Sequence, residues 1–318
     1  MDKFEFEEMV RSQSKLSVAV YGPSGSGKTT AAIKLAMGIR DELYPGQKLS
    51  DIGLFIDTER RSSTKAVGRR VGGETLEPLG FYSFEPPYDI YKLAELVEFA
   101  VAKGKQIIIV DSATAFWSGL QGILENVAEL DVKLADAKKM YGAWSEKEII
   151  SKKNALKNFM TNSGAHLIIC FRAKTEYVME ANARGKMVPK AIGLKEDMQA
   201  DIRYEFDTVL SLDKETHEVS VVKDRIGYTE IRETSEHPEA PLTAEDGKML
   251  ARLVAEGLSL EEIAARKRQK LVSFVLDEKA HKSSKVKYFE DSKSLELNQE
   301  YLDKLSYDQL LALVKYLK

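Results

Sequence analysis

The chain has 318 residues, of which 43% are hydrophobic and 31% are charged, and its formal net charge is −3. This balance is typical of a soluble globular protein, excludes wholesale disorder, and provides no general attraction to nucleic acid. The single cysteine, Cys170, excludes an internal disulfide, and four histidines give no metal-ligand spacing. With no signal-peptide pattern and no apolar run near ~20 residues, we expect a cytoplasmic protein that does not enter the membrane.

Short apolar runs alternate with helical patterns over the first two thirds of the chain. Amphipathic helical spacing at 31–39 and 91–104 separates several of these runs. Residues 107–110 are four consecutive apolar residues, which favours a strand buried on both faces, as in a parallel sheet. The predicted strands cover residues 15–21, 52–57, 81–84, 106–112, 166–171, 207–212 and 218–225, the last two as a hairpin. The pattern predicts an α/β, doubly wound fold with a mainly parallel central sheet flanked by helices.

The composition changes near residue 233. Residues 235–247 form a polar, proline-bearing stretch that is typical of a linker. Amphipathic helical segments follow at 242–257, 258–278 and 301–318, with a polar stretch near 280–298. We therefore expect a core over residues 1–232 and a small helical appendage over 233–318.

A phosphate-binding motif lies between the first strand and the first helix. Residues 22–29 read GPSGSGKT and satisfy G-x-x-x-x-G-K-[ST] in the strand and helix context that this motif requires. Glycines let backbone N–H groups turn toward phosphate oxygens, and the helix N-terminus adds its positive end. Lys28 would reach the β- and γ-phosphates of ATP, and the Thr29 hydroxyl would bind Mg²⁺. The predicted nucleotide-binding residues are Gly22, Pro23, Ser24, Gly25, Ser26, Gly27, Lys28, Thr29 and Thr30.

Carboxylates follow two of the predicted strands. Asp111 ends the buried run 107–110, where an acid commonly completes a magnesium site. The run at 52–57 ends on Asp57 and leads to Glu59, and in parallel sheets ligands bind beyond the carboxyl ends of the strands. Glu59 could polarise the water that attacks the γ-phosphate. Alternatively, Asp111 only ends its strand and Glu59 is a solvated acid.

Several motifs together resemble a known family. Their order along the chain is IDTE, FEPPYDIYKLAELVEFAV, IIIVDSATAF, FRAKTEYV, YEFDTVLSL and VVKDRIG. Over residues 15–232 this order and spacing resemble the RecA-like ATPase core. More narrowly, the chain is similar to bacteriophage-encoded RecA-like AAA-type ATPases, some of which bind and anneal single-stranded DNA in recombination.

The resemblance implies roles for individual residues. Glu59 matches the catalytic glutamate, and Asp111 with Ser112 matches the Walker B end of its strand. Lys223 and Arg225 resemble the residues that related ATPases insert into a neighbouring subunit's site, which implies a homo-oligomer, either ring or filament. Arg172 replaces a γ-phosphate-sensing glutamine of the recombinases, and an arginine there could contact phosphate directly. Alternatively, Arg172 is a solvated strand end, and Lys223 and Arg225 are surface charges of a hairpin.

A long segment after the strand at 166–171 combines basic and aromatic residues. In the RecA family a loop at this place faces DNA, and such residues suit phosphate neutralisation and base stacking. The predicted DNA contacts are Lys174, Tyr177, Arg184, Lys186, Lys190 and Lys195. A solvated lid is the alternative. Two basic runs at 265–270 and 279–287 could also hold DNA, whereas we expect Trp117 and Trp144 to be packed.

Three functions fit these observations. The favoured one is an ATPase that hydrolyses ATP with Mg²⁺, binds single-stranded DNA, and works in phage recombination, annealing or replication with phage or host proteins. The second is a regulatory or partner-loading switch driven by ATP. The third is a small-molecule kinase, although no clear arginine-bearing lid is visible in the sequence.

Overall fold

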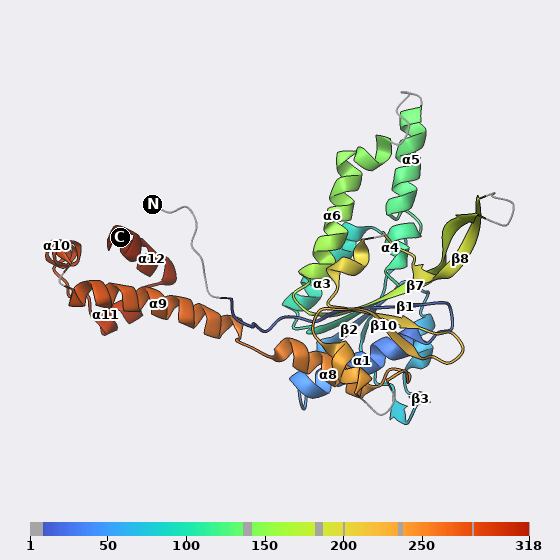
Figure 1. The fold of residues 1–318 in the computed structure, drawn as a ribbon, viewed down its shortest axis with the longest axis horizontal. Coiled ribbons are helices and arrows are strands. Elements are labelled where there is room, and N and C mark those ends of the chain that lie inside the picture. Colours follow the sequence, from blue (N-terminus) through green and yellow to red (C-terminus); the bar gives the residue numbers. More distant parts are fainter. Residues whose placement is uncertain are drawn as a thin grey trace. The chain divides into compact units, whose positions relative to one another are not determined.

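The computed structural model divides the chain into two compact units, Ser14–Ala255 and Glu256–Lys318, the latter together with the segment that ends at Gln13 (Figure 1). The structure describes residues 9–135, 142–181, 187–199, 201–234, 238–281 and 283–317. For residues 135, 175–181, 187–194 and 260 it describes the backbone alone.

The larger unit is built on an eight-stranded sheet with the order β10-β9-β1-β7-β6-β2-β5, and β8 pairs with β7. Its strands are β1 (Ser17–Gly22), β2 (Gly53–Asp57), β5 (Gly80–Ser83), β6 (Ile107–Asp111), β7 (His166–Ala181), β8 (Met187–Glu196), β9 (Thr208–Leu212) and β10 (Val219–Asp224). All neighbours are parallel except the β9–β10 and β7–β8 pairs. The predicted α/β fold with a mainly parallel sheet and a closing hairpin is therefore confirmed.

Helices cover both faces of the sheet (Figure 1). The helices of this unit are α1 (Lys28–Leu43), α2 (Leu49–Ile52), α3 (Ile90–Ala102), α4 (Thr114–Ser118), α5 (Ile123–Ala135), α6 (Lys147–Thr161), α7 (Tyr228–Glu233) and α8 (Ala244–Ala255). Alternate residues of β6 explain its continuous apolar sequence. Ile107 and Ile109 join the core beneath α1 and α8, whereas Ile108 and Val110 join the core beneath α3 and α6.

The boundary between the units lies at residue 255 rather than at the predicted 232. The segment 235–247 has the composition of a linker, but α8 packs directly on α1. A Cβ on Gly38 would lie 1.9 Å from the carbonyl oxygen of Ala244, and one on Gly247 would lie 2.3 Å from that of Leu35. Two glycines therefore allow the two helix backbones to approach, and this contact holds α8 in the larger unit.

The smaller unit is helical, as predicted. It contains α9 (Leu260–Ala280), α10 (Ser284–Lys293), α11 (Gln299–Lys304) and α12 (Tyr307–Leu317). A capping box between Ser259 and Glu262 begins α9. The polar stretch 280–298 includes α10, which the sequence analysis missed because only Val286 of that helix is fully buried. None of the helices described in either unit is long and apolar enough to cross a membrane.

The segment predicted as a DNA-facing loop is instead a β-hairpin. β7 continues from the sheet to Ala181 and pairs antiparallel with β8 (Figure 1). We ended the strand at Phe171 because the apolar run ends there. Beyond Phe171, β7 is held by backbone hydrogen bonds to β8. Such pairing does not require an apolar sequence, so the strand continues without an apolar signal.

Candidate functional site

The phosphate loop, residues 22–30, lies where the motif predicted it. β1 ends at Gly22, and α1 begins at Lys28. Gly25 and Gly27 have φ angles of 85° and 89°, which a residue with a Cβ rarely adopts. These turns direct the loop into the N-terminus of α1, where unpaired N–H groups can bind phosphate.

Lys28 and Thr29 make contacts that a bound nucleotide could replace. The Lys28 ammonium donates hydrogen bonds to the carbonyl oxygens of Gly22 (3.0 Å) and Pro23 (2.9 Å). The Thr29 hydroxyl donates to Oδ2 of Asp111 over 2.5 Å. Burial raises the pKa of Asp111 to about 6, although the bond from Thr29 acts in the opposite direction. The Thr29 hydroxyl and the buried Asp111 carboxylate form an oxygen pair of the kind that binds Mg²⁺. A bound cation would also supply a compensating positive charge for the buried carboxylate.

The two acids at the end of β2 have different environments. Asp57 is buried and accepts hydrogen bonds from the Arg61 amide and the Ser63 hydroxyl, both over 2.6 Å. It thereby holds a turn in which Arg60 and Arg61 have positive φ angles of 53° and 62°. Both carboxylate oxygens of Asp57 therefore stabilise the turn, whereas Glu59 lines a pocket.

Glu59 forms an ion pair with Arg172. The Nε and Nη2 atoms of Arg172 lie 3.1 and 2.9 Å from Oε1 of Glu59. Arg172 is directly opposite Gly22 in the β1–β7 register, so the pair lies next to the phosphate loop. The pocket around it has a volume of about 480 Å³ and is lined by Thr58, Glu59, Arg60, Ser62, Tyr88, Thr114, Ala115, Ser118, Gly119 and Arg172.

Thr58 is a positioning residue that the sequence analysis missed. Its hydroxyl donates to the Ser112 carbonyl (3.0 Å) and accepts from the Ser112 amide (2.9 Å). Its amide also donates to the carbonyl of Asp111. These bonds join the ends of β2 and β6, so that Glu59 and Asp111 are held at one edge. A threonine between two acids gave no signal by itself.

Lys223 and Arg225 are engaged with carbonyl oxygens of their own chain. The Lys223 ammonium donates to the carbonyls of Arg203 (2.9 Å), Tyr204 (2.9 Å) and Phe206 (2.5 Å), and Arg225 donates to that of Tyr204 over 2.5 Å. Burial, followed by the charge of Arg225, lowers the pKa of Lys223. A role in a neighbouring subunit's site would require both side chains to leave these carbonyls.

Of the predicted DNA contacts, the structure describes the side chains of Lys174 and Lys195. These residues are opposite each other in the β7–β8 pair, and Lys174 forms an ion pair with Asp197 at 2.7 Å. Tyr177 and Lys190 are on the two strands of the hairpin, with only their backbone described. Arg184 and Lys186 lie outside the described residues.

The remaining candidates are structural. Trp117 is buried, as predicted, and Cys170 lies in the core. Trp144 packs against Trp117 with ring centroids 6.1 Å apart. Within the residues that the structure describes, no group of three or more His, Cys, Asp or Glu side chains could hold a metal ion.

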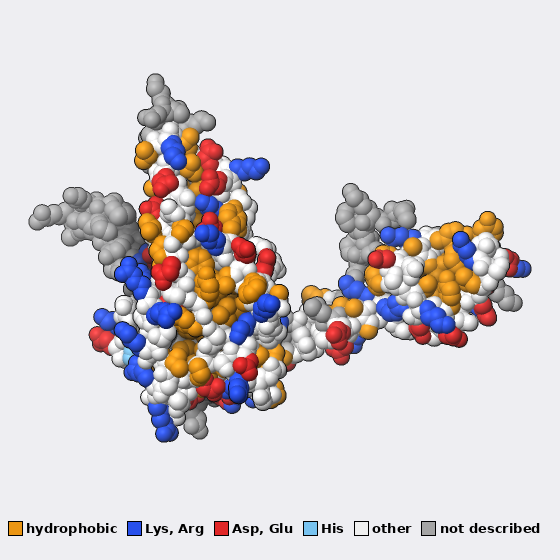
Figure 2. Space-filling model, turned by 180° about the vertical axis from the view of Figure 1, so that it is seen from behind, with side chains coloured by type: hydrophobic (Ala, Val, Ile, Leu, Met, Phe, Trp, Pro, Cys, Tyr) orange, Lys and Arg blue, Asp and Glu red, His pale blue; other side chains and the backbone are white. Residues whose placement is uncertain are grey.

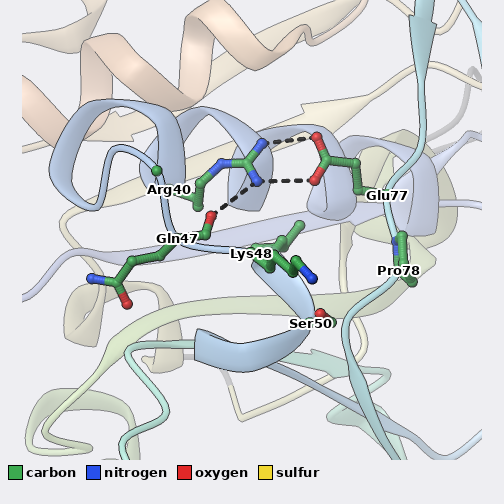
Figure 3. A pocket seen from close by; sticks show the side chains of 8 residues that line it. Arg40, Gln47, Lys48, Ser50, Glu77 and Pro78 are labelled. Carbon is green, nitrogen blue, oxygen red and sulfur yellow. Dashed lines mark hydrogen bonds and ion pairs between the residues drawn. The ribbon is translucent and has the colours of Figure 1, made fainter.

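Another pocket of about 460 Å³ lies at the end of α1 (Figure 3). Arg40 makes two hydrogen bonds to Glu77, at 2.9 and 2.8 Å, and a longer one to the Gln47 carbonyl. Figure 3 shows these groups facing one another beside Lys48. No residue of the phosphate loop lines this pocket, and its bonds hold the segment before β5 against α1.

A pocket of about 400 Å³ opens beside the phosphate loop and is a more direct candidate for the nucleotide. It shares none of its lining residues with the Glu59 pocket. Its lining residues are Gly25, Ser26, Gly27, Thr30, Ala31, Lys34, Arg69, Val71, Gly72, Leu212, His217, Pro241 and Leu242. The sequence analysis predicted nothing at His217, which is a lone histidine in a turn.

Comparison with known proteins agrees with this geometry. A search of curated proteins found no match to the chain. A family model described as an AAA domain matches residues 14–238, which is more than half of the chain and includes both pockets beside the phosphate loop except Pro241 and Leu242. The matched region contains the predicted phosphate loop and covers more than half of the chain, so the chain belongs to the AAA domain family and its larger unit is a nucleotide-binding ATPase domain.

Proposed function

We propose that this protein is a RecA-like ATPase that hydrolyses ATP with Mg²⁺ and binds single-stranded DNA in phage recombination, annealing or replication. The observation that carries this proposal is the ion pair between Glu59 and Arg172. It joins the acid beside the phosphate loop to the strand that continues as the β7–β8 hairpin. The proposed catalytic acid and the proposed DNA-binding hairpin are therefore linked by one side-chain contact.

The residues of the site suit hydrolysis. Lys28 can exchange the carbonyls of Gly22 and Pro23 for the β- and γ-phosphates, where its charge is more strongly stabilised. Glu59 accepts a proton from the attacking water as general base. Mg²⁺, when bound by Thr29 and Asp111, neutralises charge on the phosphates.

The ion pair also suits control of hydrolysis. While Oε1 of Glu59 accepts two hydrogen bonds from Arg172, this oxygen is not available to accept a proton from water. A ligand that moves the hairpin would also move Arg172, because Arg172 and the first strand of the hairpin both belong to β7. DNA on the hairpin is therefore expected to release Glu59 and stimulate hydrolysis.

The experiment that tests the proposal measures phosphate release with and without single-stranded DNA. Stimulation in the wild type, and hydrolysis without further stimulation in Arg172→Ala, would support coupling through the pair. If the protein binds DNA but its rate of hydrolysis is the same with and without DNA, the regulatory switch is favoured. Phosphate transfer to a small molecule in place of water would favour the kinase.

DNA binding by the hairpin is tested through its salt dependence. Each cation that neutralises a phosphate of single-stranded DNA contributes roughly 0.7 to the slope of log K against log salt. Replacing Arg184, Lys186 and Lys190 by alanine should flatten the slope by about two and leave ATP binding unchanged. The matched control replaces Lys285, Lys287 and Lys293, exposed cations of α10. If only the control variant loses affinity, the DNA site is in the smaller unit.

An oligomer with shared sites is also part of the proposal. Figure 2 shows hydrophobic side chains gathered over the part of the larger unit that contains α3 and α6. Exposed apolar side chains of these helices include Tyr91, Phe99 and Ile150. A second copy of the chain could cover this surface.

Mixing two inactive variants tests the shared site. Glu59→Gln lacks the base but retains Arg225, whereas Arg225→Ala lacks the arginine but retains Glu59. If Arg225 acts on a neighbour, the mixture should recover ATPase activity that neither variant has alone. A mixture as inactive as its components would show that Arg225 only binds the carbonyl of Tyr204.

A further inference from the structure

The pocket lined by Gly25, Ser26 and Gly27 of the phosphate loop has walls that are held by buried charges. Lys34 of α1 lines it, and its side chain is 4% exposed. Lys34 forms an ion pair with Glu74 at 3.0 Å, and Oε1 of Glu74 accepts a hydrogen bond from the Ala244 amide over 2.9 Å. Glu74 belongs to the two-stranded sheet of β3 (Arg70–Val71) and β4 (Glu74–Thr75). These bonds fix the sheet, with Val71 and Gly72 of the pocket wall, against α1 and α8.

A second buried pair fixes another wall. Arg232 of α7 pairs with Asp246 of α8, and their side chains are 6% and 8% exposed. Arg232 also donates to the carbonyls of Pro238 and Ala240, and Asp246 accepts from the Thr243 amide. The segment that carries Pro241 and Leu242 is therefore held at both ends beside the phosphate loop.

His217 lies over the loop from the turn between β9 and β10. Its Nδ1 is 3.1 Å from the carbonyl oxygen of Ser26. A carbonyl can only accept, so Nδ1 carries the proton, and in the neutral ring Nε2 is then an acceptor. The two ring nitrogens point in divergent directions, so Nε2 is turned away from Ser26. Asp213 accepts from the amides of Glu215 and Thr216, and this holds the turn in place.

We propose that this pocket binds the nucleoside of the nucleotide and that Nε2 of His217 reads the base. An acceptor at this position pairs with the exocyclic amino group of adenine. Guanine has an oxygen in the corresponding place, and two acceptors facing each other repel. His217 is thus a specificity-determining residue that selects a 6-aminopurine. This inference rests on the proposed use of ATP, and it names how ATP is distinguished from GTP.

The strength of one such hydrogen bond sets the expected effect. A neutral hydrogen bond contributes roughly 0.5–1.5 kcal/mol, and 1.4 kcal/mol corresponds to tenfold in affinity. Repulsion against guanine acts in the same direction. We therefore expect the ratio of ATP to GTP affinity to fall by about tenfold when the acceptor is removed.

The experiment measures the affinities of the full chain for ATP, GTP and inorganic tripolyphosphate by calorimetry. His217 has a φ of 60°, so His217→Asn is the matched variant: asparagine tolerates this backbone conformation, its amide can replace Nδ1, and it has no atom at the position of Nε2. The control is Lys214→Ala, which changes an exposed residue of the same turn. The asparagine variant should lose about tenfold in the ATP-to-GTP ratio and bind tripolyphosphate like the wild type.

Two results would overturn the inference. One is an ATP-to-GTP ratio unchanged in His217→Asn. The other is an equal loss for ATP, GTP and tripolyphosphate, which would mean that His217 acts only on the phosphate loop. Lys28→Ala separates this test from the proposed function: if that variant binds all three ligands like the wild type, the phosphate loop does not hold the nucleotide and the proposed function itself fails.

Discussion

The pocket around Glu59 and the pocket at His217 contain different kinds of ion pair. Beside Glu59, the pair with Arg172 has side chains that are 31% and 61% exposed. Beside His217, the Arg232–Asp246 pair that positions the pocket wall has side chains that are 6% and 8% exposed. Exposed pairs contribute little and can exchange partners, whereas breaking a buried pair leaves a charge without compensation. We therefore expect the Glu59–Arg172 contact to change during the proposed ATPase cycle and the wall of the His217 pocket to stay fixed.

The largest effect is expected from removing the base on the Glu59 side. Glu59→Gln keeps the shape of the side chain but loses the carboxylate that is proposed to accept a proton. Turnover should fall about 10²- to 10⁴-fold, while ATP affinity stays near that of the wild type. Single-turnover hydrolysis and calorimetry measure the two quantities. A variant that retains wild-type turnover would show that Glu59 is not the base.

The buried pair on the His217 side should control stability. Asp246→Ala leaves the Arg232 guanidinium buried without its carboxylate and removes the bond to the Thr243 amide. The free energy of unfolding should fall by about 3–5 kcal/mol, measured by urea titration. Glu245→Ala on the same helix is the control, with an expected change below about 1 kcal/mol. Equal effects of the two variants would remove the contrast between the pockets.

A buried histidine, His166 at the start of β7, should make the stability of the larger unit depend on pH. Burial, followed by the charge of Lys15, lowers the pKa of His166 from 6.5 to about 3. Below pH 6.5 the unfolded chain therefore binds a proton that the fold excludes, and stability falls as pH decreases. The loss is about 1.4 kcal/mol per pH unit down to about pH 3.

The variant His166→Asn isolates this contribution. Asparagine can still accept the hydrogen bond that the Leu16 amide donates to Nδ1, but it does not titrate. Between pH 7 and 5.5 the wild type should lose about 1.4 kcal/mol more of its unfolding free energy than the variant. Parallel pH profiles for the two proteins would contradict the assignment to His166.

The smallest effect on stability is expected at the exposed pair. Arg172→Ala should change the free energy of unfolding by less than about 1 kcal/mol, because Glu59 remains in contact with water. The same variant should alter the DNA dependence of hydrolysis. Lys174→Ala, which removes the neighbouring exposed pair with Asp197, is the control for a charge lost from β7. A loss of stability as large as that of Asp246→Ala would refute the distinction between the two pairs.

The phosphate loop and most strands of the large sheet could be predicted from the sequence because each depends on local signals. The spacing of Gly22, Gly27, Lys28 and Thr29 determines a backbone conformation within a few residues. The apolar run that ends at Asp111 predicted a strand buried on both faces, as the structure shows. Helices α5 and α6 were not predicted, because the sequence analysis assigned no helical pattern to residues 123–161.

The sequence by itself determined seven of the eight strands of the large sheet, the phosphate loop and the helical nature of the smaller unit, since periodicity and glycine geometry act over neighbouring residues. Only the tertiary structure decided which distant residues meet: Arg172 with Glu59, His217 with Ser26, and α8 with α1. The hairpin of β7 and β8 belongs to the same group. Such contacts depend on the crossing of strands and on close backbone approach across long stretches of chain, and no local pattern of residue types records them.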